Sequence, residues 1–223
     1  MDFKTYPDRE MMMMALADRI ASQLRTTLSH EGRATLSVPG GTTPGPVFDI
    51  LSDLDLDWKN IAVVLNDERW VPLSSPRSNT ALLKERLLIN KAADARLLQL
   101  YVNAPDPDER LDALSDNLRP NLPISVLLLG MGTDMHTASL FPGADKLTEA
   151  LSDDAPELMA LRAEAAGEPR ITMTARVLKD AMYTHILITG DEKRKAIEAA
   201  QSLPVEKAPV KCVLSNATVH WAQ

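Results

Sequence analysis

Short apolar runs that alternate with amphipathic segments limit what this chain can fold into. Six runs rich in Val, Ile or Leu lack clean polar alternation, at residues 34–38, 61–65, 97–102, 125–129, 184–189 and 210–214. Such runs are typical of strands buried on both faces of a parallel sheet. Apolar residues recur at helical spacing between them, at residues 9–30, 46–54, 79–88, 108–118, 175–181 and 192–201. The alternation predicts an α/β layered fold with a mostly parallel sheet.

No repeat, low-complexity tract or Gly/Ser linker interrupts this pattern, so we expect one domain over residues 1–223. Residues 147–168 are acidic, rich in Ala and weakly patterned, and we expect them to form a surface excursion. The single cysteine, Cys212, excludes an intrachain disulfide and a zinc cluster built on cysteines.

The hydropathy of the chain gives no sign of a membrane segment. The longest apolar run is the seven residues 11–17, whereas a membrane-spanning helix needs roughly 20. The N-terminus carries Asp2, Asp8 and Glu10 where a secretory signal needs basic charge followed by an apolar stretch. We therefore expect no contact with a membrane and a location in the cytoplasm.

The charge balance restricts the possible ligands. With 24 Lys and Arg against 31 Asp and Glu, the net charge is −7. Nucleic-acid binding depends on neutralising phosphates, so a nucleic-acid partner is not expected. An anionic small molecule would need a local pocket of arginine, lysine and backbone N–H groups that outweighs the overall field.

Parallel sheets bind ligands in the loops that follow their strands. The first predicted strand is followed by Gly40, Gly41, Thr42, Thr43 and Pro44. The glycines allow a tight turn, either threonine can cap a helix, and proline suits a first helical turn. Such a turn presents N–H groups to an anion, although a plain strand-to-helix connection has the same composition. The segment matches neither the dinucleotide fingerprint nor the P-loop.

Charged residues follow the second predicted strand directly. Asp67, Glu68 and Arg69 stand where a catalytic carboxylate or an anion-binding arginine is expected. A solvated charge cluster at the start of a loop is the alternative interpretation.

The loop after the fourth predicted strand is the most informative. Gly130 and Gly132 end the apolar run, and Asp134 and His136 follow. His136 follows a buried strand through a glycine turn, which none of the other histidines does; these are His30, His185 and His220. That position suits a general base, whereas a histidine that only bridges the loop is the alternative.

Two cations complete the candidate residues. Arg170 opens a short extended run at residues 171–174, and Lys193 falls in the first turn of a predicted helix. The helix dipole disfavours a cation there, so an anion bound at the same place would explain it. On the sequence alone, an ordinary surface charge is the better interpretation of each residue. The chain lacks GxSxG, HExxH and metal-ligand spacing, which leaves a metal-free, cofactor-free reaction on a small anion.

Together these segments resemble the 6-phosphogluconolactonase family, in the wider group that includes glucosamine-6-phosphate isomerase/deaminase. The matching segments are PGGTTP (39–44), NDERWVP (66–72), SNTALLKERLL (78–88), LLLGMGTDMHTASLFPG (127–143), PRITMTARVL (169–178) and GDEKRKAI (190–197). The family pattern reads Asp-Gly-His where this chain has Met135 between Asp134 and His136. We expect Met135 to adopt an ordinary negative φ, with its side chain packed beside the site.

The resemblance implies hydrolysis of 6-phospho-D-glucono-1,5-lactone in the pentose phosphate pathway, without metal or organic cofactor. It implies a three-layer αβα sandwich like that of the deaminases. By position, His136 is the general base and Asp134 orients it. The resemblance assigns the 6-phosphate to the Gly40–Thr43 turn, Arg170 and Lys193. It places Arg69 at the phosphate or near the reacting carbonyl.

Two other functions stay open at this point. One is an amino-sugar-phosphate isomerase/deaminase in which Asp67 is the proton-transfer base. The other is a non-catalytic sugar-phosphate sensor, but no segment is left over for a helix-turn-helix output module. Asp67 and Glu68 therefore remain possible site residues.

Overall fold

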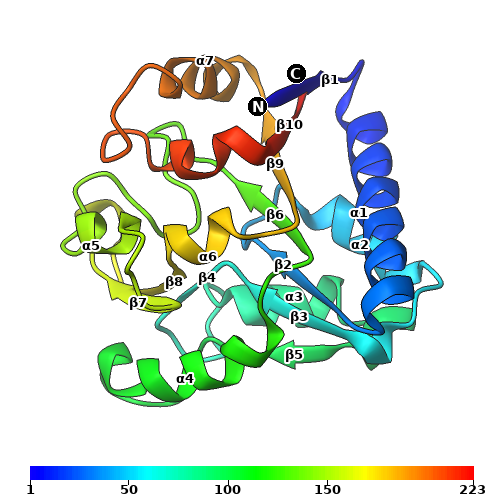
Figure 1. Ribbon diagram of the computed structural model, residues 1–223, viewed down its shortest axis with the longest axis horizontal. Helices are drawn as coiled ribbons and strands as arrows, with labels where there is room; N and C mark the ends of the chain where they lie inside the picture. Colours follow the sequence, from blue (N-terminus) through cyan, green and yellow to red (C-terminus); the bar gives the residue numbers. More distant parts are fainter.

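Two sheets of different kinds organise the computed structural model, which describes residues 1–223 (Figure 1). The larger sheet has seven strands, and every neighbouring pair in it is parallel. Its spatial order is β1 (Asp2–Thr5), β10 (Ala217–Ala222), β9 (Tyr183–Thr189), β6 (Val126–Gly130), β2 (Ala34–Val38), β3 (Ile61–Leu65) and β5 (Arg96–Leu98). The predicted α/β fold with a mostly parallel sheet is thereby confirmed.

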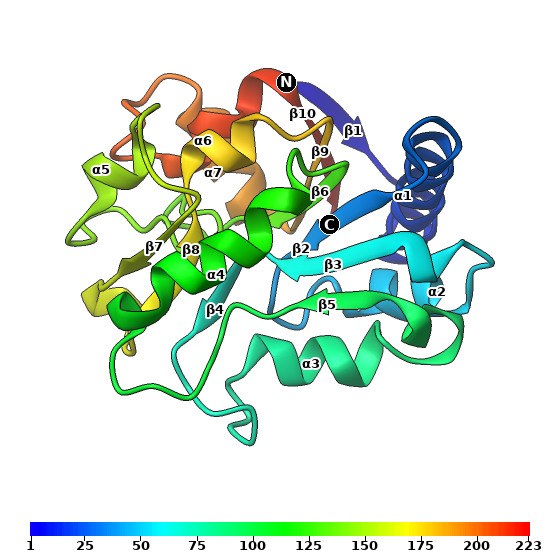
Figure 2. The ribbon, with the colours of Figure 1, turned by 60° about the horizontal axis from the view of Figure 1, so that its bottom comes forward.

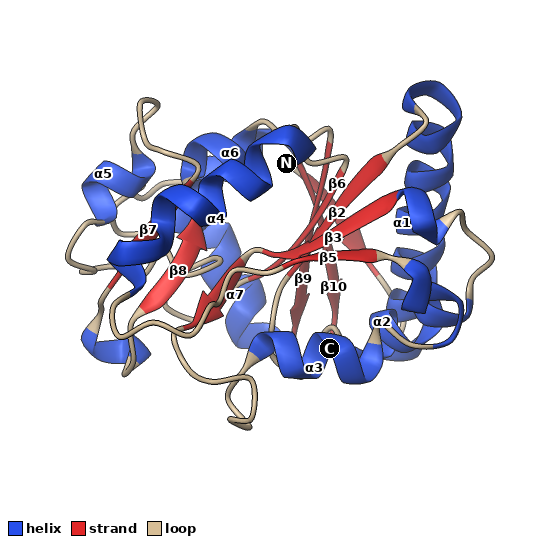
Figure 3. Ribbon diagram, turned by 90° about the horizontal axis from the view of Figure 1, so that it is seen from below, coloured by secondary structure: helices blue, strands red, loops and turns tan.

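Helices lie on both sides of this sheet (Figure 3). They are α1 (Arg9–Glu31), α2 (Gly45–Asp53), α3 (Asn79–Arg86), α4 (Leu111–Leu118), α5 (Leu147–Leu151), α6 (Ala175–Lys179) and α7 (Asp191–Ala200). The longest, α1, begins where the Asp8 carboxylate accepts a hydrogen bond from the Met11 N–H, and it ends at Gly32 with φ of 70°. Both ends thus follow ordinary capping chemistry. None of the helices combines the length and the hydropathy needed to span a membrane.

The smaller sheet has three antiparallel strands, in the order β4 (Asp67–Arg69), β8 (Arg170–Met173) and β7 (Leu158–Leu161). The extended run predicted at residues 171–174 is confirmed as β8. Two other expectations are wrong. Asp67–Arg69 is a strand and not a loop, and residues 147–168 supply α5 and the fully buried β7 instead of a surface excursion.

Three further differences concern the large sheet. The run predicted as a strand at 210–214 forms the 3₁₀ helix Pro209–Asn216, because its buried residues Val210, Val213 and Leu214 recur at helical spacing. The last strand follows it as β10. The strand predicted at 97–102 is only Arg96–Leu98, and the edge strand β1 was not predicted at all.

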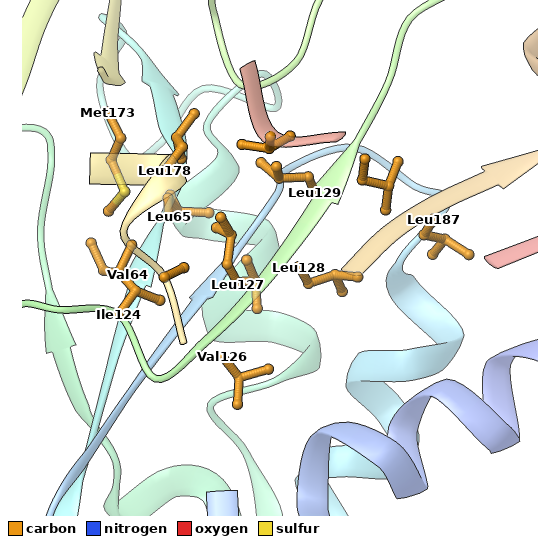
Figure 4. Close-up of a cluster of buried hydrophobic side chains, with 14 of the residues drawn as sticks. Val64, Leu65, Ile124, Val126, Leu127, Leu128, Leu129, Met173, Leu178 and Leu187 are labelled. Carbon is orange, nitrogen blue, oxygen red and sulfur yellow. The ribbon is translucent and has the colours of Figure 1, made fainter. Parts of the chain in front are cut away.

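The hydrophobic core fills the space around the central strand β6. Side chains of β6 lie beside Val64 and Leu65 of β3 and Leu187 of β9 (Figure 4). Met173 of the small sheet joins the same cluster, which includes 61 buried residues. The core therefore ties the small sheet to the large one. The carboxyl ends of β9, β6 and β2, which are neighbours in the sheet, meet at one edge of it.

Candidate active site

The loops after β2, β6 and β9 surround a cavity of about 380 Å³. Figure 2 shows β4 and β8 of the small sheet beside the strands of the large one. The cavity is lined by residues from all of these segments, including Gly40, Gly41, Thr43, Asp67, Arg69, His136, Arg170 and Lys193. Its position at the carboxyl ends of parallel strands is the usual ligand position of open α/β sheets. Its volume suits a small ligand.

The turn between β2 and α2 forms one wall. Gly41 has φ of 82°, and a Cβ on Gly40 would come within 2.1 Å of the Asn79 side chain on α3. Both positions therefore require glycine. The expected threonine cap is wrong, because α2 begins after Pro44 without any side-chain hydrogen bond. Thr42 does not line the cavity, whereas Thr43 does.

The loop after β6 carries the histidine. Nδ1 of His136 lies 2.6 Å from Oδ1 of Asp134, and the His136 N–H donates to the same carboxylate. A carboxylate only accepts, so Nδ1 carries the proton of the neutral ring and Nε2 keeps a free lone pair. The His136 side chain is 29% exposed and lines the cavity. Gly132 allows this arrangement, since a Cβ there would lie 2.3 Å from Nδ1 of His136.

The backbone of this loop is strained. Met135 has φ of 66° and Ala138 has φ of 49°, both in the left-handed region that disfavours residues with a Cβ. The expectation of an ordinary φ at Met135 is wrong. The Met135 carbonyl accepts a hydrogen bond from the Val210 N–H, and the Met135 side chain packs on the core. These contacts hold a conformation that glycine would adopt at lower cost.

Phe141 holds the histidine ring from another side. The two ring centroids are 4.2 Å apart with 31° between the planes. The guanidinium carbon of Arg170 lies 5.7 Å from the same Phe141 ring. Nothing in the sequence singles out Phe141, because an aromatic residue in a loop has no acid–base or nucleophilic chemistry of its own.

The small sheet supplies the charged wall. Arg69 and Arg170 stand directly opposite each other on β4 and β8. Asp67 lies 3.7 Å from Arg170 and accepts a hydrogen bond from Ser139. Burial lowers the pKa of Arg170, whereas the neighbouring Asp67 raises it. The cavity thus holds two guanidinium groups and one carboxylate on this side.

Glu68 points away from the cavity. It is fully buried and accepts hydrogen bonds from the backbone N–H groups of Arg69, Asn79 and Thr80. Its carboxylate therefore anchors the first turn of α3, where negative charge is favourable. Strand alternation explains the difference from its neighbours Asp67 and Arg69, which face the cavity.

Lys193 enters the cavity from the first turn of α7, as predicted. Burial lowers its pKa, and its amino group makes no hydrogen bond or ion pair with the protein. The N-cap, Gly190, has φ of 81° and no side-chain hydrogen bond. A cation and free helical N–H groups at one helix start are suited to an anion.

The other histidines lie outside the cavity. His185 of β9 and His220 of β10 are buried and hydrogen-bonded to each other at 3.0 Å. The Tyr6 hydroxyl is hydrogen-bonded to His220, and the Gln23 side chain is hydrogen-bonded to His185. Burial lowers the pKa of His185 to about 4 and that of His220 to about 3. Both are neutral structural residues near neutral pH. No group of three or more His, Cys, Asp or Glu side chains could hold a metal ion.

The structure therefore brings most of the candidate residues to one cavity. Asp134 contacts the cavity only through His136, while Thr42 and Glu68 do not reach it. Sequence reasoning missed Asn79, Ser139, Phe141 and Glu168, which touch site residues. Only the strand register of the small sheet would have drawn attention to Glu168.

Comparisons with known proteins agree with this architecture. The family model described as glucosamine-6-phosphate isomerases/6-phosphogluconolactonase matches residues 7–221. The 6-phosphogluconolactonase of Mesorhizobium japonicum is 39% identical, over 99% of this chain and 95% of that protein. The 6-phosphogluconolactonase of Pseudomonas aeruginosa is 38% identical, over 92% of this chain and 88% of that protein.

Solved structures give the same result. A 6-phosphogluconolactonase from Shewanella baltica superposes with a TM-score of 0.95 and 31% identity, covering 100% of this chain and 97% of that one. A monomeric glucosamine-6-phosphate deaminase superposes with a TM-score of 0.81 at 17% identity, over 99% of this chain and 97% of that one, and so shares the fold. The resemblance carried by the sequence motifs is confirmed: the chain is a hydrolase that belongs to the 6-phosphogluconolactonase family, within the superfamily that also includes the glucosamine-6-phosphate isomerases.

Proposed function

We propose that the protein hydrolyses 6-phospho-D-glucono-1,5-lactone to 6-phospho-D-gluconate, with His136 as the general base. The observation that carries the proposal is the 2.6 Å contact between Nδ1 of His136 and Asp134 beside a cationic cavity. That contact leaves Nε2 as the acceptor for a proton from water. A base held in the correct tautomer typically contributes 10²- to 10⁴-fold, roughly, to such a step.

The reaction follows in two proton transfers. Nε2 of His136 takes a proton from water as the water oxygen attacks the lactone carbonyl carbon. Asp134 stabilises the imidazolium that forms. The tetrahedral intermediate then breaks its bond from that carbon to the ring oxygen, and the imidazolium returns the proton to this departing oxygen. The product acid ionises at neutral pH.

The cationic residues supply binding and position. Lys193, the free N–H groups at the start of α7 and the Gly40–Thr43 turn are suited to the 6-phosphate. Arg69 and Arg170 offer further donors to anionic oxygens. Because the phosphate is remote from the reacting bond, its binding energy fixes the carbonyl against His136. A chain with a net charge of −7 needs such a concentrated cationic cavity to bind a dianion.

The test is a coupled assay with freshly generated lactone, corrected for spontaneous hydrolysis. We expect rapid formation of 6-phosphogluconate and no ammonia from glucosamine 6-phosphate. Ammonia release without lactone hydrolysis would replace this proposal with the deaminase activity and would assign proton transfer to Asp67.

A further inference from the structure

The register of the small sheet creates an electrostatic conflict beside the cavity. Arg69 of β4 and Arg170 of β8 are direct cross-strand partners. Like charges in that relation repel and destabilise the pair. Arg170 is only 8% exposed, so water screens the repulsion poorly. Some other group must therefore hold the two guanidinium groups together.

Glu168 has the position to do this. Its Oε1 atom lies 3.8 Å from Nε of Arg69, 3.7 Å from Nη2 of Arg170 and 2.8 Å from Nη2 of Arg77. The Glu168 side chain is 19% exposed and does not line the cavity. One carboxylate oxygen thus lies within 4 Å of three guanidinium groups, two from β4 and the loop that follows it and one from β8.

The other partners of the two arginines do not replace it. The Nε atoms of Arg69 and Arg170 are buried and make no hydrogen bond. Arg69 donates only to the Arg77 carbonyl, and Arg170 donates only to the Ala166 carbonyl. Neither carbonyl carries a full charge.

Asp67 relieves only part of the conflict. Its carboxylate is 3.7 Å from Arg170, and no ion pair joins it to Arg69. Glu168 is consequently the one carboxylate in ion-pair range of both arginines.

We propose that Glu168 is a positioning residue for substrate binding: its carboxylate holds Arg69 and Arg170 side by side and directed into the cavity. This inference rests on the proposed function, because it assigns the arginines to the anionic oxygens of the sugar phosphate. Glu168 itself does not touch the substrate.

The direction in which one substitution changes the binding of an anion distinguishes a positioning role from simple charge neutralisation. Glu168→Gln keeps the size of the side chain and adds one positive charge to the cluster. If Glu168 only lowered the positive potential, its loss would strengthen binding of an anion. If Glu168 positions the arginines, they separate in the variant and binding weakens in spite of the added charge.

The experiment measures the binding of 6-phosphogluconate by calorimetry, together with kcat and KM for the lactone. For Glu168→Gln we expect roughly tenfold weaker binding and a KM that rises more than kcat falls, as for a weakened charged hydrogen bond. Arg77→Met is the matched control, since it removes the closest partner of Glu168 and no cavity residue. Its dissociation constant should stay within about threefold of wild type, the range of an exposed ion pair.

Equal or tighter binding by a folded Glu168→Gln protein overturns the proposal. If that protein does not fold, Glu168→Asp provides the test, because it retains the charge but withdraws the carboxylate by roughly 1.5 Å, one C–C bond. We expect weaker binding there as well, and wild-type affinity would overturn the proposal. Inorganic phosphate is titrated as a second ligand. Wild-type protein that binds phosphate but neither binds 6-phosphogluconate nor hydrolyses the lactone would refute the proposed function, while the phosphate titrations would still decide the role of Glu168.

Discussion

The two sheets border the same cavity but contribute to it differently. The strands of the large sheet are apolar and buried, and its candidate residues lie in the loops after β2, β6 and β9. The small sheet presents Asp67, Arg69 and Arg170 from the strands themselves. A loop can change its chemistry without disturbing a core, whereas a charged strand combines binding with stability. Substitutions at His136 in the loop after β6 should therefore act mainly on rate, and those in the small sheet on binding and stability together.

The largest expected effect tests whether the loop after β6 controls the rate. Replacing His136 by Ala should lower the enzyme-catalysed rate of lactone hydrolysis by roughly 10²- to 10⁴-fold, because the general base is lost. The measurement is kcat from the coupled assay, with the thermal midpoint recorded in parallel. Binding of 6-phosphogluconate should be largely kept, since the cationic residues remain.

His30→Ala is the matched control for this variant. His30 is exposed near the end of α1, far along the chain from the loop after β6. Its replacement should leave kcat unchanged. A folded His136→Ala protein with near-normal kcat would remove His136 from the mechanism and would break the division between the two sheets.

The same division explains what the sequence predicts well. Strands β2 and β3 were predicted with their full bounds, because strands buried on both faces are continuous apolar runs. Strand β4 reads Asp-Glu-Arg and looks like a charged loop. Its strand character comes from pairing with β8, a partner about a hundred residues away in the sequence. No local pattern contains that information.

The candidate site divides in a similar way. The positions of His136, in the loop after β6, and of Lys193, in the first turn of α7, could be predicted, because each follows a recognisable strand. The roles of Glu68 and Glu168 could not be, because they depend on which face of a three-residue strand a side chain occupies and on a cross-strand register. The strand prediction for residues 210–214 is wrong for another reason, because a short apolar run does not distinguish a strand from a buried helix.

The interior of the large sheet should make folding sensitive to acid. The folded-state pKa values of His185 and His220, about 4 and about 3, lie below the ordinary value of 6.5. The unfolded chain therefore binds more protons than the folded chain below pH 6.5, and stability falls as the pH falls. Each histidine contributes up to about 1.4 kcal/mol per pH unit, until its folded form also protonates. The measurement is the free energy of urea unfolding between pH 7 and pH 5.

The charged groups near these two rings also lower the histidine pKa values, and the carboxylates titrate at lower pH. Lys4 and Arg19 are cations near both rings and oppose their protonation further. Carboxylates such as Glu157, whose pKa is lowered to about 2 mainly by its hydrogen bond with Arg119, lose stabilisation only below about 4.5. The window above pH 5 therefore isolates the histidines. The slope should persist in His136→Ala and in His30→Gln; a flat profile would show that the buried pair takes up protons in the folded state as readily as in the unfolded chain.

A smaller effect tests the binding role of the small sheet. Arg170→Ala should weaken the binding of 6-phosphogluconate by about 1.5–3 kcal/mol, the range for a hydrogen bond to a charged group. Calorimetry measures the dissociation constant. The thermal midpoint should fall as well, because Asp67 and Glu168 lose a cation within 4 Å.

Unphosphorylated gluconate provides the control for this variant. It should bind poorly to wild type and change little on substitution. Equal losses for both ligands would mean that Arg170 does not contact the phosphate, and they would leave that group to Lys193 and the glycine turn.

The smallest effect concerns the strained loop that follows β6. At a left-handed φ, a residue with a Cβ costs about 1–2 kcal/mol relative to glycine, whereas at an ordinary φ glycine is about 0.5–1 kcal/mol less stable than alanine. Met135, with φ of 66°, belongs to the first case. A comparison of Met135→Gly with Met135→Ala cancels the loss of the methionine packing, since both variants lack the side chain. We expect the glycine protein to be more stable than the alanine protein by about 1 kcal/mol, read as a higher thermal midpoint. The opposite order would mean that the loop relaxes to a negative φ in solution. The backbone beside His136 would then be held less firmly than the hydrogen bond from Val210 to the Met135 carbonyl indicates.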